Sequence, residues 1–76
     1  MAKGVHDKRY QKLLAALIAA RQDRGMSQSE LASRLGRPQQ FVSRYELSKR
    51  RLDIIEYVDV AQNLDLDPPA ELGKIL

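Results

Sequence analysis

The segment SQSELASRLGRPQQFVSRYE, residues 27–46, decides the fold because it contains two short helices and the turn that joins them. Ser27 is followed three residues later by a glutamate, the signature of a capping box, so a helix is predicted to begin there. Gly36 ends that helix after about two turns. Pro38 suits the first position of the next helix, which is predicted to run to about Leu47.

The second of these helices has two chemically different sides. At 100° per residue, its apolar residues share one side, which is predicted to be buried. The opposite side contains no acidic residue and consists of Gln39, Gln40, Ser43 and Arg44. Amide, hydroxyl and guanidinium groups pair with the edges of bases: glutamine makes two bonds to adenine, and arginine makes two to guanine. We interpret these four residues as a base-reading surface in the major groove of DNA.

Basic residues surround the same segment. The chain carries a net charge of +8 up to Leu52 (twelve Lys and Arg against four acids) and −5 from Asp53 onward (one Lys against six acids). Phosphate contacts supply most of the affinity for DNA and fix the register of the protein on it. The residues expected to touch phosphates are Gln28, Arg37, Lys49, Arg50 and Arg51.

Three features of this segment, namely the polar side of the second helix, Phe41 and Glu46, each have two interpretations. The polar side of the second helix could be no more than a solvated surface, which the basic surroundings disfavour. Phe41 could touch a thymine methyl group or sugar, or pack against Tyr45. Glu46 is expected to be structural, because a free carboxylate beside DNA would repel phosphate; one of the basic residues at 49–51 could pair with it.

Outside this segment the sequence predicts three more helices. The first covers residues 8–24, the fourth follows a capping box that begins at Asp53, and a short fifth begins at the Asp67-Pro68-Pro69 stretch. Residues 1–7 lack helical periodicity and are expected to form a flexible arm, and residues 8–76 to form one domain. The fold class is therefore all-α, a compact five-helix bundle.

The composition excludes several functions. There is no cysteine and only one histidine, too few for a metal site or a histidine-centred catalytic relay, so neither a cofactor nor an enzymatic activity is expected. The lack of cysteine is typical of the cytoplasm. The longest apolar run, residues 13–20, is too short to cross a bilayer, and nothing suggests a small-molecule ligand.

The segments SQSELASRLG and RPQQFVSRYELSKRRLD resemble the helix-turn-helix of the Cro/C1-type repressors, also called the XRE family. The resemblance extends over about residues 10–72 and implies a lambda-repressor-like DNA-binding domain. It also implies that Gln28 contacts a phosphate and supports the first residue of the recognition helix. Four positions depart from the family pattern. Ser48 stands where many members have a glycine, and Leu47 before it takes a usually polar position. Phe41 stands where members often have a small residue, and Arg37 replaces a commonly apolar one.

A single module of this size reads few base pairs, so a homodimer on a near-palindromic operator is expected. The acidic C-terminal part is poorly suited to DNA and rich in apolar residues. It is therefore predicted to form the subunit interface through Val60, Leu64, Leu72, Ile75 and Leu76. The expected function is sequence-specific, repressor-like regulation of transcription. The alternative is an antitoxin-like or adaptor module, with a toxin or polymerase as possible protein partner.

Overall fold

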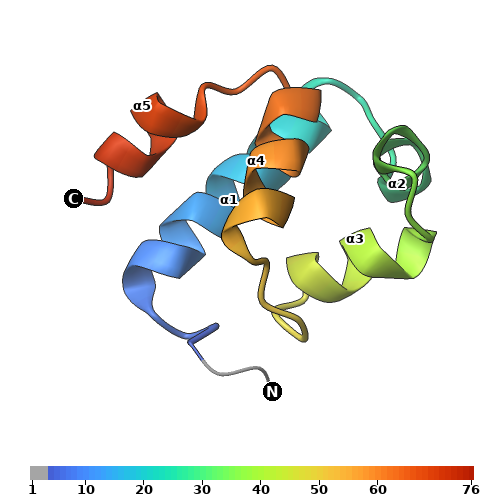
Figure 1. Ribbon diagram of the computed structural model, residues 1–76. Coiled ribbons are helices and arrows are strands. Elements are labelled where there is room, and N and C mark those ends of the chain that lie inside the picture. The colour runs from blue at the N-terminus through green and yellow to red at the C-terminus, as the bar shows by residue number, and fades with distance from the viewer. Residues whose placement is uncertain (1–3) are drawn as a thin grey trace.

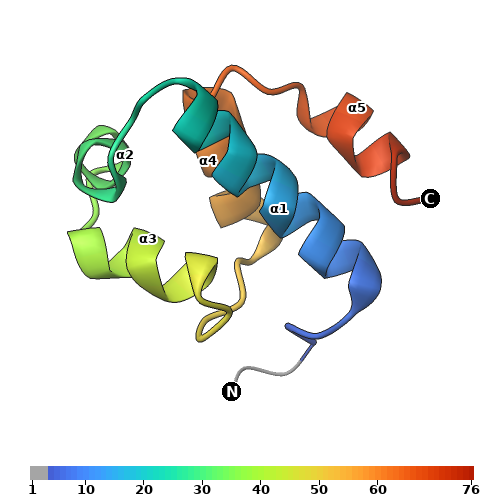
Figure 2. The same ribbon diagram turned by 180° about the vertical axis from the view of Figure 1, so that it is seen from behind.

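The structure is a computed structural model that describes residues 4–76, and this part of the chain folds into five helices without a strand. The helices are α1 (Lys8–Asp23), α2 (Gln28–Leu35), α3 (Gln39–Glu46), α4 (Ile54–Asn63) and α5 (Pro68–Gly73). Helices α1 and α4 lie in the centre of both views and share one core, with α2 and α3 on one side and α5 on the other (Figures 1 and 2). The predicted all-α fold is confirmed. None of these helices is long and apolar enough to cross a membrane.

The helix ends form where the sequence predicts them. The Ser27 hydroxyl accepts a hydrogen bond from the Glu30 amide at 3.0 Å, and Gly36 closes α2 in the left-handed conformation at φ 67°. Asp53 and Glu56 form both halves of a capping box at the start of α4. One detail differs: Pro38 is the N-cap of α3 rather than its first helical residue.

The core combines residues from α1 to α4 and from the loop before α4, and its fully buried side chains include Leu17, Leu31 and Tyr45. Val60 and Leu64 also have no exposed surface. The expectation that these two residues line a subunit interface is therefore wrong, because the chain's own core already covers them.

The N-terminal segment is also more ordered than expected. Val5 is fully buried, the amide of Asp7 donates to the carbonyl of Gly4 at 3.2 Å, and the side-chain amide of Gln11 donates to the carbonyl of Val5. The Asp7 carboxylate caps α1 by accepting from the Arg9 amide. Residues 4–7 are thus a packed turn rather than a flexible arm, while residues 1–3 of the expected arm lie outside the described residues.

Candidate nucleic-acid interface

Helix α3 is held against the core by the turn that precedes it. The left-handed Gly36 reverses the chain, and the Arg37 amide donates to the carbonyl of Ala32 at 2.9 Å. Val42 and Tyr45 of α3 are fully buried, which fixes the rotation of the helix about its axis. The opposite side of α3 must therefore face outward.

The outward side of α3 carries the four residues predicted to read bases. Gln39, Gln40 and Arg44 are exposed and Ser43 is half-buried. None of the four makes an ion pair within residues 4–76. The surface therefore presents two amides, a hydroxyl and a guanidinium group, all able to bond to base edges.

One edge of this surface is fixed by a buried carboxylate at the end of α3. Glu46 accepts from the Arg21 Nε at 2.6 Å and the Arg21 Nη2 at 2.9 Å, and these side chains are 7% and 12% exposed. The same carboxylate accepts from Gln28, whose carbonyl oxygen in turn accepts from the side chain of Gln39 at 2.9 Å. Glu46 is structural, as expected, but its partner is Arg21 of α1 and not a basic residue at 49–51.

The other edge is built on an aromatic ring. Phe41 is buried and meets Tyr45 edge to face, with ring centroids 5.6 Å apart. The guanidinium groups of Arg37 and Arg50 lie over the Phe41 ring at 4.6 and 5.0 Å from its centroid. The structure therefore favours packing over DNA contact for Phe41.

Both arginines at this edge also bind one carboxylate of α4. Glu56 accepts from the two terminal nitrogens of Arg50 at 2.8 and 2.6 Å, and Arg37 lies 3.4 Å away. These bonds from Arg50, together with the Asp53 amide, lower the pKa of Glu56 to about 2 despite its burial. The capping box alone accounts for a glutamate at this position, so the sequence gives no signal for this second role of Glu56.

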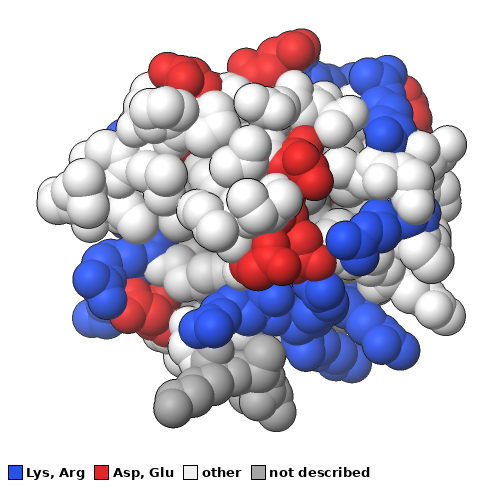
Figure 3. All heavy atoms as spheres, viewed as in Figure 1, with Lys and Arg blue, Asp and Glu red and all other residues white. Residues whose placement is uncertain are grey.

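The loop after α3 presents the remaining predicted phosphate contacts. Ser48 takes φ 59°, the conformation that a glycine would adopt more easily, and its hydroxyl accepts from Gln11 at 3.1 Å. The turn therefore keeps its shape without a glycine. Lys49 and Arg51 are exposed, and neither makes an ion pair with residues 4–76. Figure 3 shows Lys and Arg gathered along the lower edge of the molecule, where this loop lies in Figure 1.

A separate apolar surface lies on the side of α5. Of the residues predicted for the subunit interface, Leu72 and Ile75 are half-buried and Leu76 is fully exposed. Ile54 and Ile55, which begin α4, are 59% and 66% exposed.

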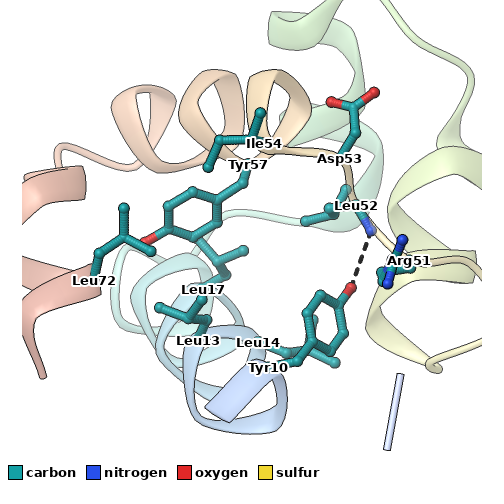
Figure 4. Close-up of a pocket in the computed structure, with 10 residues that line it drawn as sticks. All are labelled: Tyr10, Leu13, Leu14, Leu17, Arg51, Leu52, Asp53, Ile54, Tyr57 and Leu72. Atoms are coloured by element: carbon teal, nitrogen blue, oxygen red, sulfur yellow. Dashed lines mark hydrogen bonds between the residues drawn. The ribbon is translucent and has the colours of Figure 1, made fainter. Parts of the chain in front are cut away.

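Next to this surface an open groove of about 330 Å³ lies between α1, α4 and α5 (Figure 4). Its walls are mostly leucine, isoleucine and tyrosine, with Arg51 and Asp53 at the loop before α4. The hydroxyl of Tyr10 accepts from the Leu52 amide at 3.1 Å and closes that end. Within residues 4–76 no group of three His, Asp or Glu side chains could hold a metal ion.

Helices α2 and α3 are short and pack against each other across a glycine turn, and α3 exposes a hydrogen-bonding side. This arrangement defines a helix-turn-helix DNA-binding domain. Residues 17–70 match the family model described as helix-turn-helix. The chain is 51% identical to a solved XRE-family like protein from Pseudomonas syringae pv. tomato str. DC3000, with a TM-score of 0.86 over 96% of this chain and 89% of that chain. None of the curated proteins matches the chain. The chain belongs to the Cro/C1-type, or XRE, family of helix-turn-helix proteins, a non-enzymatic family.

Proposed function

We propose that this protein is a sequence-specific regulator of transcription, repressor-like in action, that binds a near-palindromic operator as a homodimer. The observation that carries the proposal is the outward side of α3, which is exposed, polar and free of acids. No chemical step is involved: occupancy of promoter DNA blocks or contacts the polymerase.

Base recognition is assigned to the four outward residues of α3, namely Gln39, Gln40, Ser43 and Arg44. Each glutamine can make two bonds to adenine N6 and N7, and Arg44 can make two to guanine O6 and N7. The chain of bonds from Arg21 through Glu46 and Gln28 to Gln39 supports this assignment, because it orders the first reading side chain before DNA binds.

Phosphate contacts are assigned to residues on both sides of α3, namely Gln28, Arg37, Lys49, Arg50 and Arg51. Gln28 is the first residue of α2, where free backbone amides and the positive end of the helix dipole already favour a phosphate. Lys49 and Arg51 are exposed in the loop and available to the backbone. The side chains of Arg37 and Arg50 stay 44% and 39% exposed while they bind Glu56.

We assign the subunit interface to the apolar surface on the α5 side. Helix α5 has no fully buried residue: Leu72 is half-buried, and beyond the helix Ile75 is half-buried and Leu76 exposed, so all three keep apolar surface that a second copy can cover. Ile54 adds an exposed apolar side chain beside the groove, and burying one such residue contributes about 1.5 to 3 kcal/mol.

Charge supports a two-fold arrangement of this surface. Arg51 and Asp53 both line the groove, so a patch that carries one of each sign can meet its own copy with opposite charges paired. Such a dimer would place two α3 helices in successive major grooves about 34 Å apart.

The DNA-binding proposal is tested by selecting the preferred site from a random duplex library and then comparing variants on that site and on random duplex. Arg44→Ala should cost about 1 to 3 kcal/mol on the selected site and little on random DNA. Lys49→Ala should weaken both and lower the salt dependence by about one charge. Lys74→Gln, which removes the same charge from α5, is the matched control. Equal losses on every duplex for Arg44→Ala would refute the base-reading assignment.

The dimer is tested by sedimentation at micromolar concentration. Ile54→Asp should give a monomer, and the fold should survive because an acid is favourable in the first turn of a helix. Leu47→Asp is the control: Leu47 is 62% exposed but lies at the end of α3, away from α5. A monomeric wild-type protein, or equal dissociation by both variants, would overturn the assignment.

A further inference from the structure

Arg37, Arg50, Phe41 and Glu56 form a single cluster at the edge of the reading surface. Arg37 comes from the turn before α3, Arg50 from the loop after it, and both guanidinium groups lie over the Phe41 ring. Both also bond to the carboxylate of Glu56 in α4. Two residues 13 positions apart in the sequence are thereby held beside the same helix.

The cluster is arranged with its positive groups outward and its negative group inward. The Glu56 side chain is 9% exposed, whereas the side chains of Arg37 and Arg50 are 44% and 39% exposed. Arg50 uses both terminal nitrogens for Glu56, but a guanidinium group has five N–H donors, so donors remain for a further acceptor. The pair of arginines with one carboxylate keeps a net charge of +1.

We propose that Glu56 is a positioning residue for DNA binding: it holds Arg37 and Arg50 together as one clamp for a backbone phosphate beside α3. The proposal rests on the proposed function, which assigns both arginines to phosphates. A free arginine loses side-chain entropy when it grips a phosphate, and Glu56 together with Phe41 removes that loss in advance.

Glu56 could position the two arginines or merely neutralise positive charge. These two roles predict opposite effects of Glu56→Gln on the affinity for DNA. If Glu56 only cancels positive charge, then Glu56→Gln raises the net charge from +3 to +4 and must strengthen binding to any duplex. If Glu56 positions the clamp, the same change weakens binding although the protein becomes more positive. The substitution keeps the cap of α4, because glutamine also serves at this position of a capping box.

The experiment measures affinity for a 20-base-pair duplex of random sequence from 50 to 200 mM salt, so that only backbone contacts matter. We expect Glu56→Gln to weaken binding. The plot of log K against log salt should become less steep, its negative slope shrinking in magnitude by about 0.9, which corresponds to the loss of one phosphate contact. Asp65→Asn changes the charge equally at an exposed residue beyond α4, and it should not weaken binding. Arg50→Ala should cost less affinity in the Glu56→Gln background than in the wild type.

Arg50→Lys provides a second test that leaves the cap of α4 intact. Lysine keeps the charge but cannot make two parallel bonds to Glu56, so this variant should also lower the affinity. Tighter or unchanged binding by Glu56→Gln, or wild-type binding by Arg50→Lys, would overturn the proposal while the wider function stands. If Arg50→Ala leaves binding unchanged, the phosphate assignment of Arg50 itself fails, and the clamp fails with it.

Discussion

The ion pairs of Glu56 predict a specific loss of stability in acid. The hydrogen bonds from Arg50 are the main cause that lowers the pKa of Glu56 from 4.5 to about 2, and the Asp53 amide and the charge of Arg37 add to it. Each pKa unit corresponds to about 1.4 kcal/mol, so the full difference would give about 3 kcal/mol. Because both arginines are more than a third exposed, water screens the pairs, and we expect about 2 kcal/mol.

The sign follows from linkage. Glu56 has a lower pKa in the folded protein than in the unfolded chain, so its contribution is fully present above about pH 5. It is lost as the pH falls from about 5 toward 2, where the carboxylate becomes protonated in both states.

The measurement is urea unfolding, followed by circular dichroism at several pH values and at one fixed protein concentration. The wild type should exceed Glu56→Gln in free energy of unfolding by about 2 kcal/mol at pH 7, and the gap should close as the pH approaches 2. Asp65→Asn, at a side chain that is 79% exposed, should show no such closing gap. A gap of constant size from pH 7 to 3 would refute the reasoning, because it would mean that the carboxylate charge contributes nothing.

Three further substitutions, and one control in α5, test the packing of the helix-turn-helix by urea unfolding. The buried hydroxyl of Tyr45 has no hydrogen-bond partner among residues 4–76, so Tyr45→Phe should leave the free energy of unfolding unchanged or raise it by about 1 kcal/mol. A clear loss would reveal a partner. Gly36→Ala should lower it by about 1 kcal/mol through backbone strain alone, since nothing lies near the added carbon, while Gly73→Ala in α5 should be neutral or favourable. Glu46→Ala leaves the buried charge of Arg21 unpaired and should cost about 3 kcal/mol, and a loss below 1 kcal/mol would contradict the role of this pair.

The elements that the sequence predicted well depend on residues close together in the chain. A cap such as Ser27 needs only the amide three residues later, and a left-handed residue such as Gly36 needs only its own backbone. The outward side of α3 follows from helical periodicity within eight residues. These features could be read before the fold was known, because no distant part of the chain decides them.

The features that the sequence could not predict depend on contacts between distant segments. Periodicity places Val60 and Ile54 in one helix, but only the packing of α1 to α3 against α4 shows that the first is buried and the second exposed. Val5 gave no signal because one apolar residue has no period, yet it is fully buried. The groove combines α1, α4, α5 and a loop, so no single stretch of sequence reveals it.

Helix α3 shows how the two kinds of information combine. Its outward hydrogen-bonding groups are local and predictable, but the contacts at its two edges come from two carboxylates. Glu46 holds Arg21 and Gln28 on one edge, and Glu56 holds Arg37 and Arg50 on the other. Each of them is nearly buried behind basic groups, so the negative charge holds these basic groups in place without itself facing outward. Glu46 lies within α3, whereas Glu56 belongs to α4, whose first residue is the exposed Ile54 assigned to the subunit interface. A change in the first turn of α4 would therefore affect both the edge of α3 and the proposed subunit interface. For this reason Glu56→Gln should be tested for its oligomeric state as well as for its affinity for DNA.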